Sequence, residues 1–126
     1  MVKVNTRPAD AGALLGKIKP LKCWHVAEVP HLAFAGLQAY HDSTQHLRGW
    51  AERRQAIADA ADKAGRTRDL LARHGIECPT VTGAGTFEFE LASGVYTELQ
   101  CGSYIFMDAD YGRNFDRDGA RPSRSS

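Results

Sequence analysis

The sequence predicts an α/β domain built on a parallel sheet. Two observations carry this prediction: a long amphipathic helix pattern lies between two short apolar runs, and a glycine-rich turn follows the second run. Strands that alternate with helices in this order are typical of parallel α/β folds. A parallel sheet normally buries both faces, whereas a single helix covers only one of them, so we also expect an incomplete architecture.

Composition narrows the class of protein further. The 126 residues are 43% hydrophobic and 25% charged, as in a globular domain with a single core. Sixteen basic and fifteen acidic residues give a net charge of +1, which argues against a nucleic acid or an anionic membrane as partner. The sequence shows no apolar run of membrane-spanning length and no signal peptide. Three cysteines without a Cys-x-x-Cys pair indicate reduced thiols, so we expect a cytoplasmic protein.

The predicted elements follow in chain order. Residues 11–18 favour a short helix and residues 21–29 a strand or loop, although Pro and Gly interrupt this region. Residues 33–40 predict a buried strand, in which Gly36 indicates a close approach by another part of the backbone. Alternating or apolar patterns predict further strands over residues 79–82, 87–91, 96–100 and 104–107.

The longest predicted element is a helix over residues 44–74. Asp42 and Ser43 are suitable N-caps, and Gly75 is suitable for the C-terminal end. Its apolar stripe is expected to contain Leu47, Trp50, Ala51, Ile57, Ala58, Ala61, Ala64, Leu70 and Leu71. Its solvated face is expected to contain Glu52, Arg53, Asp59, Asp62, Lys63, Arg66 and Asp69.

The segment Thr82-Gly83-Ala84-Gly85-Thr86 follows a predicted strand. Glycines expose backbone N–H groups and threonines add hydroxyl donors, so the segment suits a phosphate group. It lacks the Gly-Lys-Ser/Thr of a P-loop and the third glycine of a dinucleotide-binding fingerprint. Phosphate binding and a plain turn therefore both remain open.

The five histidines have none of the spacings of a metal site, and we expect no metal site in this chain. His41 and His46 flank the start of the predicted helix, a position where histidine is commonly a polar cap.

Motifs in four places then add a resemblance to a known family. They are GLQAYH at residues 36–41, VTGAGT at 81–86, SGVYTELQ at 93–100 and GSYIFMDADYGRN at 102–114. In this order they resemble the D-threonine aldolase and D-serine dehydratase family, most closely D-threonine aldolase. The resemblance extends from about residue 32 to residue 114 and is weak before Pro30. It implies a partial (β/α) barrel of the alanine racemase-like type, which binds pyridoxal phosphate (PLP).

The resemblance also implies a division of the chain. Residues 1–102 would form later strands and an outer helix of the barrel, and residues 103–114 would begin an appended β domain. Residues 115–126 are rich in Arg, Asp, Gly, Pro and Ser, which predicts a disordered tail. The glycine-rich turn would be the phosphate site that such barrels place after a late strand.

The site residues follow from the same resemblance. His41 would be the catalytic residue near the substrate, and PLP would be held by Gln38, Tyr40, Thr82, Gly83, Ala84, Gly85 and Thr86. The implied activity is that of a lyase of D-amino acid metabolism: retro-aldol cleavage of a D-3-hydroxy amino acid to glycine and an aldehyde, with PLP as electron sink. The family also uses a divalent metal. Its metal ligands and its Schiff-base lysine lie outside the matching region, and no residue of this sequence takes their place.

Two functions therefore remain open. In the first, the chain is a truncated piece of a PLP-dependent D-threonine aldolase, inactive by itself, whose small-molecule substrate is a D-amino acid. In the second, the chain is a non-catalytic fragment or an interaction module that needs a partner chain or forms a homodimer. An absorbance band from lysine-bound PLP would separate the two.

Overall fold

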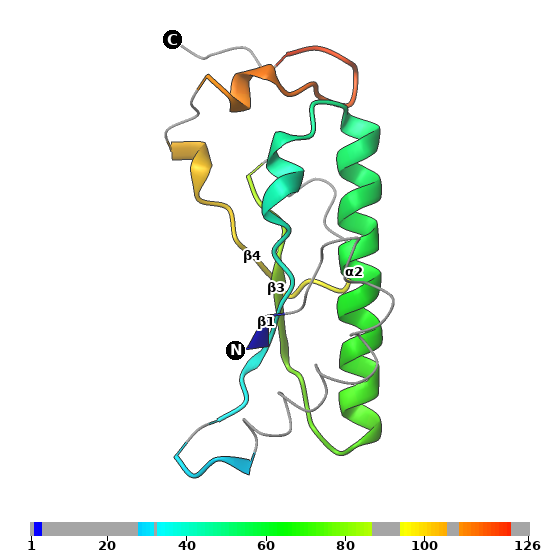
Figure 1. Ribbon diagram of the computed structural model, residues 1–126, viewed down its shortest axis with the longest axis vertical. Coiled ribbons are helices and arrows are strands. Elements are labelled where there is room, and N and C mark those ends of the chain that lie inside the picture. Colours follow the sequence, from blue (N-terminus) through cyan, green and yellow to red (C-terminus); the bar gives the residue numbers. More distant parts are fainter. Residues whose placement is uncertain (1, 4–27, 32, 87–93, 106–108, 122–126) are drawn as a thin grey trace.

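A computed structural model describes residues 2–3, 28–31, 33–86, 94–105 and 109–121 (Figure 1). Within these residues, four parallel strands form one sheet in the order β1-β2-β3-β4. The strands are β1 (Val2–Lys3), β2 (Gly36–Gln38), β3 (Thr80–Gly83) and β4 (Glu98–Leu99). The helix α2 (Trp50–Arg73) connects β2 to β3 and lies along one side of the sheet. The predicted parallel α/β arrangement is thus confirmed.

The strand predicted over residues 33–40 is confined to β2. Gly36 pairs with Thr80 of β3 and has a φ of +149°, a backbone conformation that favours glycine. A Cβ atom at this position would lie 2.0 Å from the carbonyl oxygen of Thr80. The predicted close approach at Gly36 is therefore confirmed, and its cause is the pairing of the two strands.

The later strands are confirmed only in part. The predicted strand over residues 96–100 shortens to β4, and residues 103–105 form the 3₁₀ helix η4 (Ser103–Ile105). The prediction of a strand starting at residue 104 is therefore wrong for residues 104 and 105. The expectations for residues 11–18, 21–27 and 87–91 lie outside the described residues.

The helix begins later than the sequence predicted. Residues 42–46 form the separate 3₁₀ helix η2 (Asp42–His46), and Gly49 is the N-cap of α2, with an extended backbone (φ −76°, ψ 132°). Asp42 and Ser43 therefore do not cap α2. The break brings η2 over the end of the sheet, whereas a continuous helix would have carried these residues away from it.

The C-terminal end of α2 matches the prediction. Gly75 has a φ of +76°, its N–H donates to the carbonyl of Ala72 (3.0 Å), and the N–H of Ile76 donates to that of Leu71 (3.0 Å). This pair of hydrogen bonds is the Schellman motif, which glycine permits because it adopts the left-handed conformation without strain. Helix α2 is continuous through Gly65.

The buried face of α2 differs from the predicted stripe at several positions. Ala51 and Ala58 are exposed, whereas Ala60 is fully buried. Arg53 and Lys63, both assigned to the solvated face by the sequence, are also buried, with Arg53 only 1% exposed. Arg53 is buried because its guanidinium group donates to the carbonyls of Leu47 (2.7 Å), Arg48 (3.0 Å) and Phe115. The predicted solvated face is correct for the remaining residues, Glu52, Asp59, Asp62, Arg66 and Asp69.

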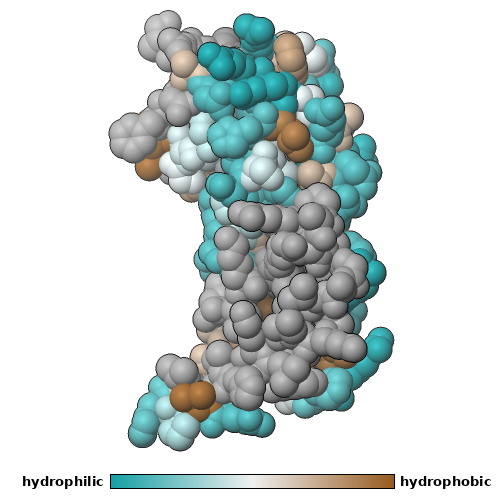
Figure 2. All heavy atoms as spheres, viewed as in Figure 1, coloured by the Kyte–Doolittle hydropathy of each residue, from teal (hydrophilic) through white to brown (hydrophobic). Residues whose placement is uncertain are grey.

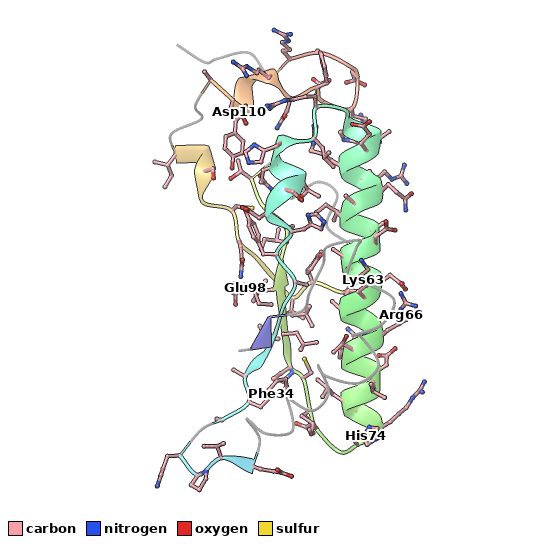
Figure 3. All side chains as sticks on the ribbon, in the orientation of Figure 1. Phe34, Lys63, Arg66, His74, Glu98 and Asp110 are labelled. Atoms are coloured by element: carbon pink, nitrogen blue, oxygen red, sulfur yellow. The ribbon has the colours of Figure 1, made fainter. Side chains whose placement is uncertain are left out.

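The apolar core lies between the sheet and α2. Leu37 and Ala39 come from β2 and the residue after it, Val81 from β3, and Ala64 and Leu71 from α2. All five side chains are fully buried. Figure 3 shows that Phe34 and His74 lie at one end of this layer and Asp110 at the other. Small alanine side chains on α2 allow the helix to approach the sheet closely.

Residues 109–121 pack beside the start of α2. They include η5 (Tyr111–Arg113) and a turn in which Asp116 Oδ1 accepts hydrogen bonds from the N–H groups of Asp118 and Ala120. The disordered tail and the separate β domain stay predictions, and residues 122–126 lie outside the described residues.

Figure 2 shows that hydrophilic residues dominate the described surface at the end of the molecule that contains residues 109–121, with isolated hydrophobic residues between them. In the described part of the chain, no helix combines the length and apolarity that crossing a bilayer requires.

Candidate cofactor site

The carboxyl ends of β2, β3 and β4 lie at the same edge of the sheet because the strands are parallel. Residues 39–41 follow β2, residues 84–86 follow β3, and residues 100–101 follow β4. The 3₁₀ helix η2 lies over this edge (Figure 1). Functional sites of α/β barrels occur at this edge, so the structure brings the predicted site residues together at the expected place.

The turn after β3 is buried and narrow. Thr82, Gly83, Ala84, Gly85 and Thr86 are all buried, the two threonine side chains included. Ala84 has a φ of +53°, a left-handed conformation that costs about 1 kcal/mol for a residue with a Cβ atom. Such strain is characteristic of segments whose backbone conformation serves a function.

Neighbouring side chains leave no room for a Cβ atom at either glycine of the turn. A Cβ atom at Gly83 would lie 2.2 Å from the ring of Tyr96, and one at Gly85 would lie 2.2 Å from Nε2 of Gln45. A side chain at either position would therefore displace a neighbour or open the turn. Because the glycines carry no side chain, Tyr96 and Gln45 pack directly against the backbone of the turn.

A chain of amide hydrogen bonds joins the three strand ends. Gln38 Nε2 donates to Gln100 Oε1 (3.4 Å), and Gln100 Nε2 donates to Thr82 Oγ1 (2.8 Å). The backbone N–H of Gln100 is shared between the carbonyls of Gly83 (3.0 Å) and Ala84 (3.1 Å). Gln100 thus holds the turn from the side of β4. It lies in one of the matching motifs, yet the sequence did not single it out.

His41 and Tyr40 lie next to the turn, directly after β2. The ring of His41 is buried, and its Nδ1 lies 3.1 Å from Ser43 Oγ. The carbonyl of His41 accepts a hydrogen bond from the hydroxyl of Thr44. Ser43, predicted as a helix cap, therefore orients the His41 ring instead. Tyr40 is half-buried beside it.

Gln45 on η2 is the second residue that the sequence did not single out. Its side chain is only 2% exposed and lies against Gly85. The sequence pattern did not indicate a role for Gln45, because a glutamine inside a predicted amphipathic helix is normally a solvated surface residue.

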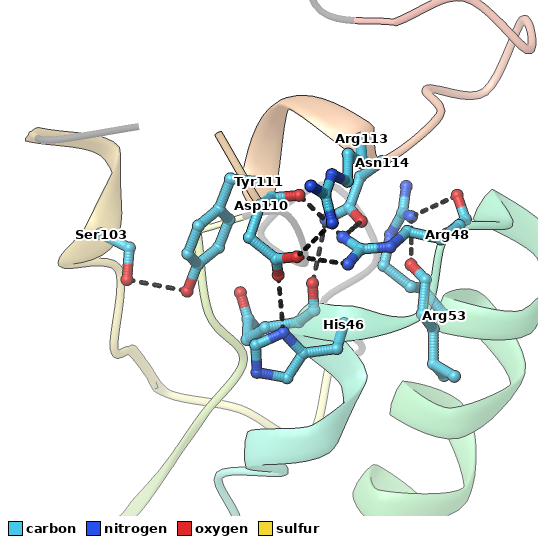
Figure 4. A network of polar contacts seen from close by, with 10 residues as sticks. His46, Arg48, Arg53, Ser103, Asp110, Tyr111, Arg113 and Asn114 are labelled. Atoms are coloured by element: carbon cyan, nitrogen blue, oxygen red, sulfur yellow. Dashed lines mark hydrogen bonds and ion pairs between the residues drawn. The ribbon is translucent and has the colours of Figure 1, made fainter. Parts of the chain in front are cut away.

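A polar network holds η2 and η5 together (Figure 4). Asp110 accepts hydrogen bonds from Arg48 Nη2 and pairs with His46 Nδ1 (2.8 Å), and Arg48 Nη1 donates to Asn114 Oδ1 (3.0 Å). The hydrogen bond from Arg48, followed by that from His46, lowers the pKa of the Asp110 carboxyl group below its ordinary value. His46, expected to be a helix-cap residue, thus forms a hydrogen bond with Asp110 that joins distant segments.

The two described cysteines, Cys78 and Cys101, are free thiols. Burial raises the pKa of the Cys78 thiol, which disfavours the thiolate form. Cys101 Sγ contacts the carbonyl oxygen of Gly85 at 3.5 Å. Cys101 therefore packs against the turn.

The residues present fit the phosphate group of PLP. The turn contains two buried threonines and two glycines with no room for a side chain. Beside it, Gln45 of η2 has a buried amide that makes no hydrogen bond within the described residues. Among the described residues, no group of three or more His, Cys, Asp or Glu side chains is arranged to hold a metal ion.

These features define a parallel α/β domain with a candidate site at the carboxyl ends of its strands. Comparison with known proteins makes the resemblance specific, although no protein-family model matches the chain. The chain is 55% identical over 89 residues to a D-threonine aldolase of an Arthrobacter species, a match that covers 69% of this chain and 24% of the relative. It is 43% identical over 97 residues to 3-hydroxy-D-aspartate aldolase of Paracoccus denitrificans strain Pd 1222, a match that covers 75% of this chain and 25% of the relative.

A solved structure agrees with both relatives. The crystal structure of D-threonine aldolase from Filomicrobium marinum matches with a TM-score of 0.80 and 43% sequence identity, over 92% of this chain and 32% of that chain. The predicted fold class, a partial barrel of the alanine racemase-like type, is confirmed. The predicted resemblance to part of D-threonine aldolase is confirmed as well, and the chain spans about a quarter of the length of the curated relatives it matches.

Proposed function

We propose that this chain supplies the phosphate-binding part of a PLP-dependent lyase that cleaves D-3-hydroxy amino acids to glycine and an aldehyde. The observation that carries the proposal is the buried turn from Gly83 to Thr86 at the carboxyl edge of a parallel sheet. The names of the relatives support the substrate class, because D-threonine and 3-hydroxy-D-aspartate are both D-3-hydroxy amino acids.

Each predicted residue has a place in this proposal. The backbone of the turn and the hydroxyls of Thr82 and Thr86 would hold the phosphate, since N–H and O–H donors suit a dianion. Gln38 and Tyr40 would lie beside the rest of the cofactor at the end of β2. When bound, PLP draws electron density away from the substrate Cα, which is the chemistry that retro-aldol cleavage needs. His41, held through Nδ1 by Ser43, would orient a polar group of the substrate.

The lysine and the divalent metal of the proposed reaction would come from outside these 126 residues. No histidine of the sequence is followed two positions later by Asp or Cys, the pattern that the resemblance implies for metal ligands. We therefore expect that the chain alone, supplied with PLP and a divalent metal, releases no glycine from D-threonine. The free thiols of Cys78 and Cys101 support a cytoplasmic location for the assembled protein.

The test transfers the chain into an active relative. Residues of this chain replace the 89-residue segment with which they align in the Arthrobacter D-threonine aldolase. We expect the purified chimera to bind PLP and to release glycine and acetaldehyde from D-threonine but not from L-threonine. The double variant Gly83→Val/Gly85→Val should lose cofactor and activity, because the added side chains collide with Tyr96 and Gln45. Gly94→Val is the matched control, since a Cβ atom there meets nothing within 4 Å.

A folded chimera that neither binds PLP nor cleaves D-threonine would overturn the proposal. It would favour the alternative function, a non-catalytic module that pairs with another chain or with a second copy of itself. One observation favours that alternative: Leu99 on β4, at the edge of the described sheet, is 43% exposed. The open edge of a sheet presents unpaired backbone N–H and C=O groups, with which another chain can pair.

A further inference from the structure

The side chain of Gln45 is buried without satisfied polar atoms. Both Nε2 and Oε1 are inaccessible to solvent, and neither makes a hydrogen bond within the described residues. Its main chain, in contrast, is held firmly: the carbonyl of Gln45 accepts a hydrogen bond from Asn114 Nδ2 (2.9 Å), and Asn114 is itself fully buried. The amide is therefore fixed in a place where it loses hydration and gains nothing in return.

Such an arrangement is unusual in a folded protein. A buried amide normally finds a partner, because leaving its donor and acceptor unpaired costs free energy that folding does not recover. An apolar residue of similar size at position 45 would avoid this cost. The amide is thus explained by a partner that binds at this place rather than by the stability of the fold.

The position of the amide indicates which partner. A Cβ atom built on Gly85 would lie 2.2 Å from Gln45 Nε2 and 2.8 Å from Oε1, so the amide lies directly over the backbone of the glycine-rich turn. Thr86, a buried residue with a side-chain hydroxyl, is the next residue of the same turn. A primary amide offers two N–H donors, and donors that converge with backbone N–H groups suit an anion.

We propose that Gln45 is a further phosphate-binding residue, whose Nε2 donates a hydrogen bond to a phosphate monoester held at the Gly83–Thr86 turn. This inference rests on the proposed function, because the ester in question is that of PLP. It extends the site from the turn itself to η2. It also explains why η2 and α2 are separate helices, since the break between them places Gln45 over the turn.

The test measures phosphate-ester binding and unliganded stability in the same variants of the full chain. The ligand is pyridoxine 5′-phosphate, which has no aldehyde and cannot react with lysines, compared with pyridoxine in isothermal titration calorimetry. Gln45→Leu removes the amide, and Gln45→Met does so with an unbranched side chain in case leucine disturbs packing. Gln55→Leu is the matched control, because Gln55 is exposed on α2 and bonds only to Asp59 (2.8 Å) among the described contacts.

We expect Gln45→Leu and Gln45→Met to weaken pyridoxine 5′-phosphate binding by about tenfold or more, the effect of losing a hydrogen bond to a charged group. The same variants should raise the midpoint of thermal unfolding without ligand, because they remove an unpaired buried amide. Gln55→Leu should leave binding unchanged, and pyridoxine should bind no variant. A merely structural glutamine would give the opposite stability result, a lower midpoint.

Three results would overturn the inference, and they separate it from the proposed function. Equal binding by the parent chain and the Gln45 variants would remove Gln45 from the site and leave the turn as the phosphate site. A lower unfolding midpoint in both Gln45 variants would make the residue structural. Absence of binding by the parent chain would refute the phosphate site itself and, with it, both proposals.

Discussion

Replacing Arg53 by leucine is expected to destabilise the protein by about 2–4 kcal/mol, although helix propensity barely changes. The guanidinium group donates to three carbonyls: Nη1 to those of Leu47 (2.7 Å) and Arg48 (3.0 Å), and Nη2 to that of Phe115. Hydrogen bonds from a charged donor contribute about 1.5–3 kcal/mol each. If the two hydrogen bonds that share Nη1 are counted as one, their loss costs about 3–6 kcal/mol of unfolding free energy. Burial of the apolar leucine side chain offsets about 1–2 kcal/mol of this loss.

The assay is urea-induced unfolding of Arg53→Leu, followed by far-ultraviolet circular dichroism, with limited proteolysis of the segment that contains Phe115. We expect a lower midpoint and faster cleavage after residue 112, since the variant releases the carbonyl of Phe115. Arg66→Leu serves as control, because Arg66 is exposed and pairs only with Asp62 among the described ion pairs (2.7 Å). Equal free energies of unfolding for Arg53→Leu and Arg66→Leu would show that the buried guanidinium adds no stability.

Two further predictions concern the sheet and the polar network. Gly36→Ala should destabilise by at least about 3 kcal/mol, because the new Cβ atom would lie 2.0 Å from the carbonyl oxygen of Thr80 at a φ of +149°, and urea unfolding measures the loss. Asp110→Asn should reduce stability near pH 6, and its difference from the parent chain should shrink as the pH falls below about 3.9. The hydrogen bond from Arg48 lowers the pKa of Asp110 in the folded state, so the contribution of the carboxylate is fully present above its unfolded pKa of about 3.9 and is lost as the pH falls through the folded value.

Each of these predictions has a matched control. Gly94→Ala adds a Cβ atom that meets nothing within 4 Å, so its free energy of unfolding should equal that of the parent chain. A similar loss in both glycine variants would contradict the steric argument. Asp62→Asn removes a carboxylate from an exposed helix pair and should change the pH dependence little. A gap between Asp110→Asn and the parent that does not shrink as the pH is lowered below the unfolded pKa of about 3.9 would refute the linkage argument.

The parts of the fold that depend on local sequence patterns could be predicted. The run of apolar residues behind Pro30 and the small-residue turn after residue 82 locate β2 and β3, and Gly75 locates the end of α2. Local signals failed at the start of the helix. Asp42 and Ser43 look like caps in sequence, yet Ser43 bonds to the His41 ring and the helix begins eight residues after Asp42, at Trp50.

The site was predicted where it consists of consecutive residues and missed where it depends on distant ones. The turn from residue 82 to residue 86 lies in one segment, so its glycines and threonines are visible as a motif. Gln45 and Gln100 reach the same turn from 41 and 14 residues away from Thr86, counted along the printed sequence. The residues that precede and follow each glutamine do not indicate that its side chain contacts the glycine-rich turn.

By itself, the sequence determined the parallel α/β class, the order strand, helix, strand of β2, α2 and β3, and the position of the glycine-rich turn. These features depend on hydrophobic period and on glycine conformations, which act between residues close in the chain. Only the tertiary structure decided that Arg53 is buried and that Gln45 lies over Gly85. The reason is physical: burial of a polar side chain depends on acceptors and ligands that other segments bring to it, and only folding brings those segments together.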